Sequence, residues 1–258
     1  MSYETIILGK KDGIARITMN IPEKLNPLDL VMREELKESF RDIAADKAVR
    51  VVVMTGAGKA FCAGGDITTM AGIRATAGRD RLKNVQELVR LMTSLEKPII
   101  AAVNGFATGA GMHIALACDI IIASEKAKFR ESFILIGLIP DMGGFYLLPG
   151  RVGLARAKEL MMTGRLFDAK EAESMGIINK VVPPEDLEGE VMDLAQTLAR
   201  GPARAYAMIK SALNRWPMSL QSCLELEANM QAIALSSADF DEGRRSFLEK
   251  RQPQFMGE

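Results

Sequence analysis

The chain has 258 residues, and its 33 Lys and Arg balance its 33 Asp and Glu, so the formal net charge at pH 7 is zero. This balance argues against nucleic acid or an acidic membrane surface as the main partner. Apolar residues make up 48% of the chain, beside 22 Gly and 10 Pro, a composition that fits a globular protein and excludes disorder, collagen and coiled coil.

Cysteine use is sparse, because Cys62, Cys118 and Cys223 lie far apart and form no C-x-x-C pair. This pattern is expected of reduced thiols. The first residues carry no secretion-signal pattern. The most apolar stretch, residues 98–123, is interrupted by polar residues and glycines, which predicts a protein core rather than a membrane span. We therefore expect a cytoplasmic protein without a membrane partner.

The chain is predicted to open with an antiparallel strand pair. Residues 3–19 alternate apolar and polar side chains on either side of Asp12-Gly13, which is a strong hairpin signal. Apolar residues recur at helical spacing over 28–44, and a valine-rich run at 51–54 follows. The order predicted here is hairpin, helix and buried strand.

The helix-then-strand order repeats further along the chain. A helical stripe over 82–95 ends at Lys97-Pro98, and the run at 99–103 predicts a second buried strand. A short helix at 109–117 then precedes a third apolar run at 120–123. Strands that alternate with helices are typical of an α/β protein.

The remainder of the chain is predicted to be mostly helical. After Pro149 no long β-branched run occurs, and the apolar residues keep helical spacing. Gly201-Pro202 and Trp216-Pro217 are each predicted to separate two helices. These C-terminal helices are expected to pack on the α/β core or on a neighbouring subunit.

A nucleotide site is the first alternative to consider, because residues 55–61 follow a buried strand as a phosphate-binding loop would. They fit neither template, since Ala60 stands where a P-loop needs Ser or Thr and Phe61 stands where a Rossmann turn needs Gly. With one histidine in the chain, a His-rich metal site or a Ser-His-Asp triad is not expected either. We predict no bound metal.

Two glycine-rich loops, 61–66 and 104–112, each follow a buried strand and lead toward a predicted helix. Small residues let backbone N–H groups approach a ligand, and a helix start adds partial positive charge, so the loops could together hold an anionic oxygen. Asp66 and Thr108 are predicted helix caps. Tight packing at the turns is the alternative, but the presence of two such loops favours a site.

A third segment, residues 137–144, puts Asp141 between an apolar stretch and a pair of glycines. Burial there would raise the pKa of Asp141 toward that of a useful general base. Asp141 is therefore the candidate base.

Several segments together resemble the enoyl-CoA hydratase/isomerase, or crotonase, superfamily over nearly the whole chain. They are residues 22–26 (PEKLN), 51–56 (VVVMTG), 60–66 (AFCAGGD), 97–105 (KPIIAAVNG), 115–119 (ALACD), 137–144 (GLIPDMGG) and 242–251 (EGRRSFLEKR). The resemblance implies an α/β fold built as a spiral of ββα units, with a core at residues 1–200. It also implies a helical C-terminal region at 201–258 that forms a homotrimer or a dimer of trimers.

The same resemblance implies an acyl-CoA thioester substrate, with coenzyme A entering as part of that substrate and no further cofactor. The backbone N–H groups of Gly65 and Ala110 would hold the thioester carbonyl in an oxyanion hole that stabilises an enolate. The peptide at Ala63 would contact the adenine, and Lys24 and Lys59 would lie near the CoA phosphates. For the two lysines, solvated surface charge is the alternative.

The sequence departs from the family's hydratases at two carboxylates. Where those hydratases carry glutamates, this chain has His113 and Phe133, so ordinary hydration lacks both its acid and its base. Asp141 matches the catalytic aspartate of dienoyl-CoA isomerases and of ring-expanding isomerases of phenylacetate breakdown. Residues 237–243 and 253–255 also resemble the latter group.

Three hypotheses follow. The first is an enoyl-CoA isomerase that moves a β,γ double bond to the α,β position with Asp141 as its only base. The second is a hydratase or thioester hydrolase in which His113 and Asp141 activate water, although His113 could instead be a packed core residue. The third is a catalytically silent acyl-CoA-binding protein. Phe133 is expected to line a dry acyl pocket, and Glu131, a weaker catalytic candidate, is expected to be a surface carboxylate.

Overall fold

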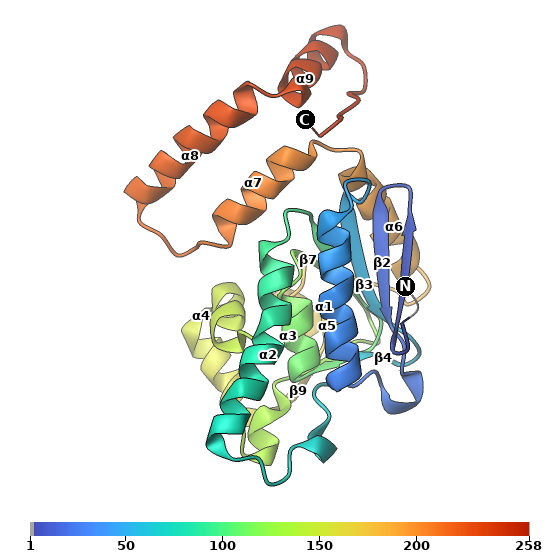
Figure 1. Ribbon diagram of the computed structural model, residues 1–258, viewed down its shortest axis with the longest axis vertical. Helices are drawn as coiled ribbons and strands as arrows, with labels where there is room; N and C mark the ends of the chain where they lie inside the picture. Colours follow the sequence, from blue (N-terminus) through green and yellow to red (C-terminus); the bar gives the residue numbers. More distant parts are fainter. Residues whose placement is uncertain (1–2, 258) are drawn as a thin grey trace.

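The computed structural model describes residues 3–257, apart from the side chain of Thr69. Its strands form a six-stranded sheet in the order β1-β2-β3-β5-β7-β10 and a four-stranded sheet in the order β4-β6-β8-β9 (Figure 1). The strands are β1 (Ile6–Lys11), β2 (Ile14–Met19), β3 (Val51–Gly56), β4 (Ala60–Cys62), β5 (Ile99–Val103), β6 (Phe106–Thr108), β7 (Ile120–Ser124), β8 (Lys128–Arg130), β9 (Leu166–Asp168) and β10 (Lys180–Val182).

The helices pack around the sheets and then continue into a C-terminal arm. They are α1 (Leu30–Ala45), α2 (Ala75–Ser94), α3 (Ala110–Leu116), α4 (Gly144–Thr163), α5 (Ala169–Ser174), α6 (Leu187–Ala199), α7 (Ala203–Leu213), α8 (Leu220–Leu235) and α9 (Ala238–Glu249), with short 3-10 turns η1 (Pro22–Lys24), η2 (Ile67–Thr69) and η3 (Ser132–Ile136). Within residues 3–257, none of these helices combines the length and apolarity that crossing a bilayer requires.

The predicted N-terminal hairpin is confirmed. Strands β1 and β2 pair antiparallel, with Ile6 opposite Met19. Asp12 and Gly13 both have positive φ, 52° and 78°, as a two-residue type I′ turn requires. The hairpin joins the larger sheet because β2 pairs parallel to β3.

The chain then repeats a strand–strand–helix unit three times: β3, β4 and α2, then β5, β6 and α3, then β7, β8 and α4. The first strand of each unit enters the larger sheet, and the second enters the smaller sheet, parallel to its predecessor. The predicted spiral of ββα units is confirmed. The second strands have only three residues each, too few to show an alternating pattern in the sequence.

The valine-rich run at β3 is buried along its whole length because both of its faces are covered. Val52 and Met54 belong to the cluster that includes the apolar faces of α1, α2 and α3. Val51 and Val53 face the opposite way, into a second cluster with α6. Strands covered on both faces read as continuous apolar runs, which explains the pattern seen in the sequence.

Helices α7, α8 and α9 project from the body of the molecule as a C-terminal arm (Figure 1). The predicted breaks at 201–202 and 216–217 are confirmed, since they fall between α6 and α7 and between α7 and α8. Lys210 fixes α7 to the body, because its Nζ lies 2.8 Å from Asp119 Oδ2 and 3.0 Å from the carbonyl oxygen of Lys97. The arm exposes large apolar side chains, among them Leu220, Leu224, Ile233, Phe247 and Leu248.

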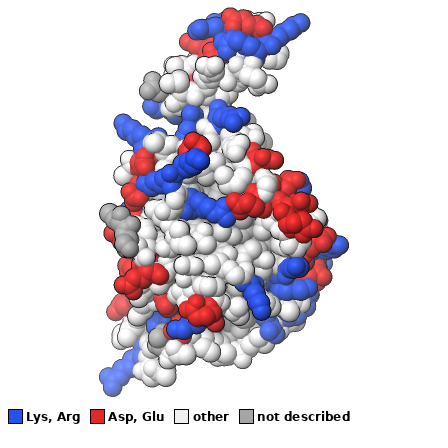
Figure 2. Space-filling view, turned by 90° about the vertical axis from the view of Figure 1, so that its right-hand side faces the viewer, with Lys and Arg blue, Asp and Glu red and all other residues white. Residues whose placement is uncertain are grey.

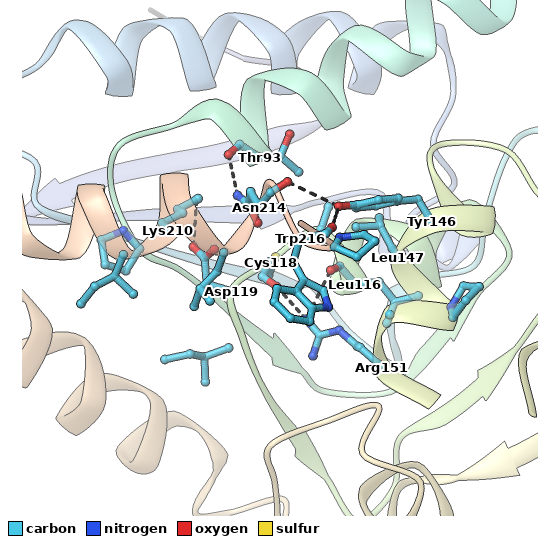
Figure 3. Close-up of a pocket in the computed structure, with 18 of the residues that line it drawn as sticks. Thr93, Leu116, Cys118, Asp119, Tyr146, Leu147, Arg151, Lys210, Asn214 and Trp216 are labelled. Carbon is cyan, nitrogen blue, oxygen red and sulfur yellow. Dashed lines mark hydrogen bonds and ion pairs between the residues drawn. The ribbon is translucent and has the colours of Figure 1, made fainter. Parts of the chain in front are cut away.

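A groove of about 750 Å³ lies where α4 meets α7 (Figure 3). The polar groups in it are engaged with each other: the guanidinium of Arg151 donates to the carbonyl oxygens of Leu116 and Cys118 at 3.3 and 3.0 Å. Among the described residues that line the groove, none is a predicted site residue. The groove therefore lies at the interface between the body and the arm.

The surface carries charges of both signs. On the face shown in Figure 2, acidic and basic side chains lie intermingled around a broad uncharged area. This distribution agrees with the balanced composition of the chain.

Candidate active site

The two glycine-rich loops lie against each other. Thr108 Oγ1 donates to the carbonyl oxygen of Ala63 at 2.7 Å. Gly64 has a φ of +107°, and a Cβ there would stand 2.9 Å from the carbonyl oxygen of Thr108. A Cβ on Gly111 would stand 2.0 Å from the carbonyl oxygen of Cys62. Only glycine permits this close backbone contact between the loops.

One of the two predicted helix caps is confirmed and one is wrong. Asp66 accepts a hydrogen bond from the backbone N–H of Thr68 at 3.0 Å and caps η2. Thr108 does not cap α3, because Gly109 occupies the cap position, with no side-chain hydrogen bond. Thr108 ends strand β6, and its hydroxyl is used to join the two loops instead.

The structure brings the backbone amides of Gly65 and Ala110 into the same neighbourhood. Ala110 is the first residue of α3, where a helix leaves its N–H groups without intrahelical partners. A Cβ on Gly64 would stand 3.8 Å from the nitrogen of Ala110. In the described part of the chain, neither amide donates a hydrogen bond. Two free donors of this kind can stabilise an oxygen that gains negative charge.

His113 forms a buried pair with Glu131. Its Nε2 lies 2.9 and 3.1 Å from the two carboxylate oxygens of Glu131, and the two side chains are 0% and 1% exposed. The expectation that Glu131 is a surface carboxylate is therefore wrong. Residue 131 follows the short strand β8 directly and leads into η3, so its side chain points under α3 rather than into solvent.

Phe133 covers the other side of this pair. Its ring stacks on the His113 ring with a centroid distance of 5.2 Å and an interplanar angle of 15°. Its Cζ lies 3.7 Å from the position of a Cβ on Gly109, at the start of α3. Phe133 is therefore an apolar wall between the buried pair and the loop that carries Ala110.

Asp141 lies in the loop that leads into α4. Its Oδ1 is buried and has no hydrogen-bond partner among the described residues. Burial raises the pKa of the Asp141 carboxyl above its ordinary value, while the nearby His113 and Arg33 oppose that rise and Glu131 adds to it. The direction is the one expected from the sequence.

A tight turn carries Asp141 and the start of α4 onto α3. The backbone N–H of Gly144 donates to the carbonyl oxygen of Asp141 at 2.8 Å, across Met142 and Gly143, which have φ values of 46° and 82°. A Cβ on Gly144 would stand 2.3 Å from Cε1 of His113, so this contact needs glycine. His113 Nδ1, like Asp141 Oδ1, is buried and lacks a partner among the described residues. Orphaned polar atoms in one site are groups that a bound ligand can engage.

The predicted CoA-binding residues lie at the edge of the two loops. Lys24 ends η1 and is exposed. The residue after it, Leu25, accepts a hydrogen bond from the backbone N–H of Ala63 at 3.0 Å. Lys59 is also exposed, and its backbone packs tightly on Gly105. Lys24 and Ala63 therefore lie close together. Lys59 lies in the loop between β3 and β4.

Arg33 also belongs to this region, although the sequence did not predict it as a site residue, and it is 3% exposed. Its Nη2 lies 3.9 Å from the position of a Cβ on Gly65. A signal was present, because Arg33 precedes Leu36 by three residues and Phe40 by seven, and so shares the apolar face of α1. Across residues 3–257, no three His, Cys, Asp or Glu side chains are arranged to hold a metal ion.

Comparisons with known proteins agree on one family. The family described as enoyl-CoA hydratase/isomerase matches residues 9–258. The chain is 40% identical over 258 residues to a probable enoyl-CoA hydratase of Rhodobacter capsulatus, covering 100% of both. It is 39% identical to the 1,2-epoxyphenylacetyl-CoA isomerase of Escherichia coli strain K12, covering 98% of this chain and 99% of the relative.

A solved structure has the same fold. The crystal structure of enoyl-CoA hydratase from Bacillus anthracis superimposes with a TM-score of 0.94 at 34% identity, covering 99% of this chain and 100% of that chain. This similarity and the repeated ββα units confirm the predicted fold class.

Proposed function

Because this chain belongs to the enoyl-CoA hydratase/isomerase family, we propose that it moves the double bond of an enoyl-CoA from the β,γ to the α,β position, with Asp141 as the base. The observation that carries this proposal is the buried Oδ1 of Asp141, which has no hydrogen-bond partner among the described residues and belongs to a carboxyl whose pKa is raised by burial. A carboxylate whose pKa is raised is a stronger base than an ordinary one, and the carboxyl that it forms can return the proton. The names of the relatives include hydratase and isomerase, so the choice between them rests on the site.

The reaction needs one base and one oxyanion hole. The N–H groups of Gly65 and Ala110 donate to the thioester carbonyl oxygen. Asp141 removes a proton from the α-carbon, and the electron pair moves into the carbonyl to give a dienolate that the two amides stabilise. The Asp141 carboxyl then returns the proton to the γ-carbon. The product has the same composition as the substrate, and no water is consumed.

In this proposal His113 has a structural role. Its Nε2 is engaged by Glu131, and its ring is held between Phe133 and the backbone of Gly144. Phe133 lines the acyl pocket and excludes water from the side where related hydratases place a glutamate. A dry pocket protects the dienolate from side reactions and strengthens the hydrogen bonds of the oxyanion hole.

The Glu131–His113 pair favours a second candidate function. A carboxylate that holds an imidazole through one nitrogen orients the other nitrogen as a general base, and His113 Nδ1 has no partner among the described residues. Together with Asp141 it could activate water, which would make the protein a hydratase or a thioester hydrolase. A silent acyl-CoA-binding protein is the third possibility, and it predicts no product at all.

Coenzyme A enters this proposal as part of the substrate, without a further cofactor. The peptide at Ala63 would hold the adenine, and the ammonium groups of Lys24 and Lys59 would lie near the phosphates. Support comes from the exposure of both lysines and from the contact of Ala63 with the residue that follows Lys24.

We assign assembly to residues 201–258 and acyl-CoA binding to residues 1–200, in a homotrimer or a dimer of trimers. The exposed apolar side chains of the arm support this division. So does an apolar groove of about 530 Å³ between α7, α8 and α9, whose lining includes Met208, Phe240 and Phe255. Exposed apolar surface of this kind is typical of protein–protein interfaces.

The test is a product analysis by mass spectrometry with trans-3-enoyl-CoA and trans-2-enoyl-CoA in heavy water. An isomerase converts the trans-3 substrate, places deuterium at the γ-carbon and adds no oxygen. A hydroxyacyl product would support the hydratase instead, and a free acid with free CoA would support the hydrolase. No turnover and no deuterium exchange with either substrate would support the silent binder.

A further inference from the structure

Arg33 is a buried cation that has no ion-pair partner among the described residues. Its side chain is 3% exposed, and its Nε donates to the carbonyl oxygen of Leu28 at 2.9 Å. Within residues 3–257, its Nη1 has no hydrogen-bond partner and its guanidinium forms no ion pair. Since arginine stays protonated in proteins, this is a charge removed from water with one hydrogen bond to replace its hydration.

One turn later, helix α1 contains a second buried cation, Lys37, which is paired with carboxylates. Lys37 is 2% exposed, and its Nζ lies 2.7 Å from a carboxylate oxygen of Glu34 and 3.5 Å from one of Glu87. A cation with a structural role is therefore paired in this same helix. Arg33 is about as buried as Lys37, but within residues 3–257 no carboxylate forms an ion pair with it. This difference indicates that its hydrogen-bonding partner comes from outside the chain.

The guanidinium adjoins the reacting end of the proposed substrate. Its Nη2 lies 3.9 Å from the position of a Cβ on Gly65, whose amide we assign to the thioester oxygen. Burial lowers the pKa of Arg33, and Arg81 on α2 lowers it further, while Asp141, Asp29 and Asp66 act in the opposite direction. Arg33 is thus flanked by the oxyanion-hole loop and by the candidate base.

We infer that Arg33 binds a second oxygen of the acyl group, so that the substrate is an acyl-CoA with a hydrogen-bond-accepting oxygen a few bonds from the thioester. A hydrocarbon chain would leave the guanidinium buried and unpaired in the complex as well. A carbonyl, hydroxyl or ether oxygen would accept a charge-assisted hydrogen bond, and the planar fork of arginine offers two such donors. This inference deepens the proposed function, because it rests on the thioester lying against Gly65, but it does not depend on the direction of the reaction.

The test compares two unreactive thioesters that differ in one oxygen, butyryl-CoA and acetoacetyl-CoA, by calorimetric titration of the full-length protein. The wild-type protein is expected to bind acetoacetyl-CoA more tightly. Arg33→Met should reduce that preference by about tenfold to a hundredfold and leave the affinity for butyryl-CoA within about threefold, because only the charge-assisted hydrogen bond is lost.

Lys37→Met is the matched control, since it removes a buried cation from the same helix. It should lower the melting temperature, because Glu34 and Glu87 each lose an ion pair with a buried ammonium group, and it should leave the preference between the thioesters unchanged. Arg33→Met should not lower the melting temperature of the ligand-free protein, because removing a buried charge that forms no ion pair within residues 3–257 offsets the lost hydrogen bond to Leu28. If Arg33→Met does not fold, Arg33→Gln, which keeps the length and loses the charge, is titrated in the same way.

Three results would overturn the inference. An unchanged preference in the Arg33 variant would show that the guanidinium contacts no second oxygen. Equal weakening of both thioesters would show that it acts on the thioester or on the CoA moiety. Failure of the wild-type protein to bind either thioester would overturn the proposed function along with this inference. The first two results would overturn the inference about Arg33 alone, so failure of the inference can be distinguished from failure of the proposed function.

Discussion

The candidate active site and the C-terminal arm depart from the usual distribution of side chains in opposite directions. The site buries Arg33, Glu131 and one carboxylate oxygen of Asp141, whereas the arm exposes Phe247, which is 83% exposed, and Leu248. Each arrangement is unfavourable for a ligand-free single chain. We expect a thioester to complete the first region and further copies of the chain to complete the second. On this proposal, the first surface serves chemistry and the second serves assembly.

Lys210, where α7 joins the body, differs from the buried polar groups of the site in having partners within the chain. Lys210 is buried like the site residues, but Asp119 and a backbone carbonyl satisfy it within the chain. His113 and Asp141 each keep a buried polar atom without a partner among the described residues. Buried charge alone therefore does not mark the site, whereas buried charge with an unused hydrogen-bonding atom does.

The largest expected effect comes from Asp141→Asn, which should lower kcat by about 10²–10⁴-fold because the base is lost. Binding of an unreactive acyl-CoA should stay close to the wild-type level, because the proposed contacts come from backbone groups at Ala63, Gly65 and Ala110. Steady-state kinetics and calorimetric titration measure the two effects. Asp193→Asn, at an exposed position on α6, is the control. Retention of most activity in Asp141→Asn would remove this residue as the base.

The second change addresses the arm. Phe247→Glu places a charge on an exposed apolar side chain, so the isolated chain should fold normally while the assembly weakens by at least about tenfold, or about 1.4 kcal/mol per interface. Analytical ultracentrifugation measures the distribution of species. Ile7→Glu changes another exposed apolar residue, which lies on β1 and not in the arm, and should leave the assembly intact. An unchanged assembly in Phe247→Glu would contradict the role given to the arm.

A smaller effect is expected inside the buried pair. His113→Gln should keep isomerase activity within about tenfold, equivalent to about 1.4 kcal/mol of barrier, because the imidazole only packs in the proposed mechanism. Glu131→Gln keeps the shape of its partner and should behave similarly. Mass spectrometry of the products decides the matter: a loss near 10²–10⁴-fold, together with loss of a hydroxyacyl product made by the wild type, would establish the hydratase alternative.

The smallest effect concerns stability and pH. Burial raises the pKa of Asp141 in the folded protein, so its contribution to stability is present below the unfolded pKa of about 3.9 and is lost as pH rises through the folded pKa. Asp141→Asn should therefore have a higher Tm than the wild type at pH 7. The two Tm values should converge toward acidic pH. Scanning calorimetry over this range tests the sign, and a Tm difference that does not change with pH would contradict it.

Much of the fold could be predicted from the sequence because it depends on local periodicity. The Asp12-Gly13 turn, the valine-rich strand β3 and the helix breaks at 201–202 and 216–217 each have a cause within a few residues of chain. Glycine-rich loops and a carboxylate beside a glycine pair likewise identify the segments of the candidate site. What these patterns determine is which segments form elements and which loops can approach a ligand.

Tertiary structure alone decided how those segments meet. Glu131 becomes the buried partner of His113 because β8 pairs with β6 and places Glu131 next to α3. The two residues are 18 positions apart, and no local periodicity encodes their contact. Thr108 joins two loops instead of capping a helix for the same reason. In the sequence, Arg33 is a basic residue on an apolar helix face. Only the packing of α1 against the loop at Gly65 makes it a buried cation whose Nη1 has no hydrogen-bond partner among the described residues. Burial and partner choice depend on the stacking of the ββα units, and the sequence near each residue does not specify that stacking.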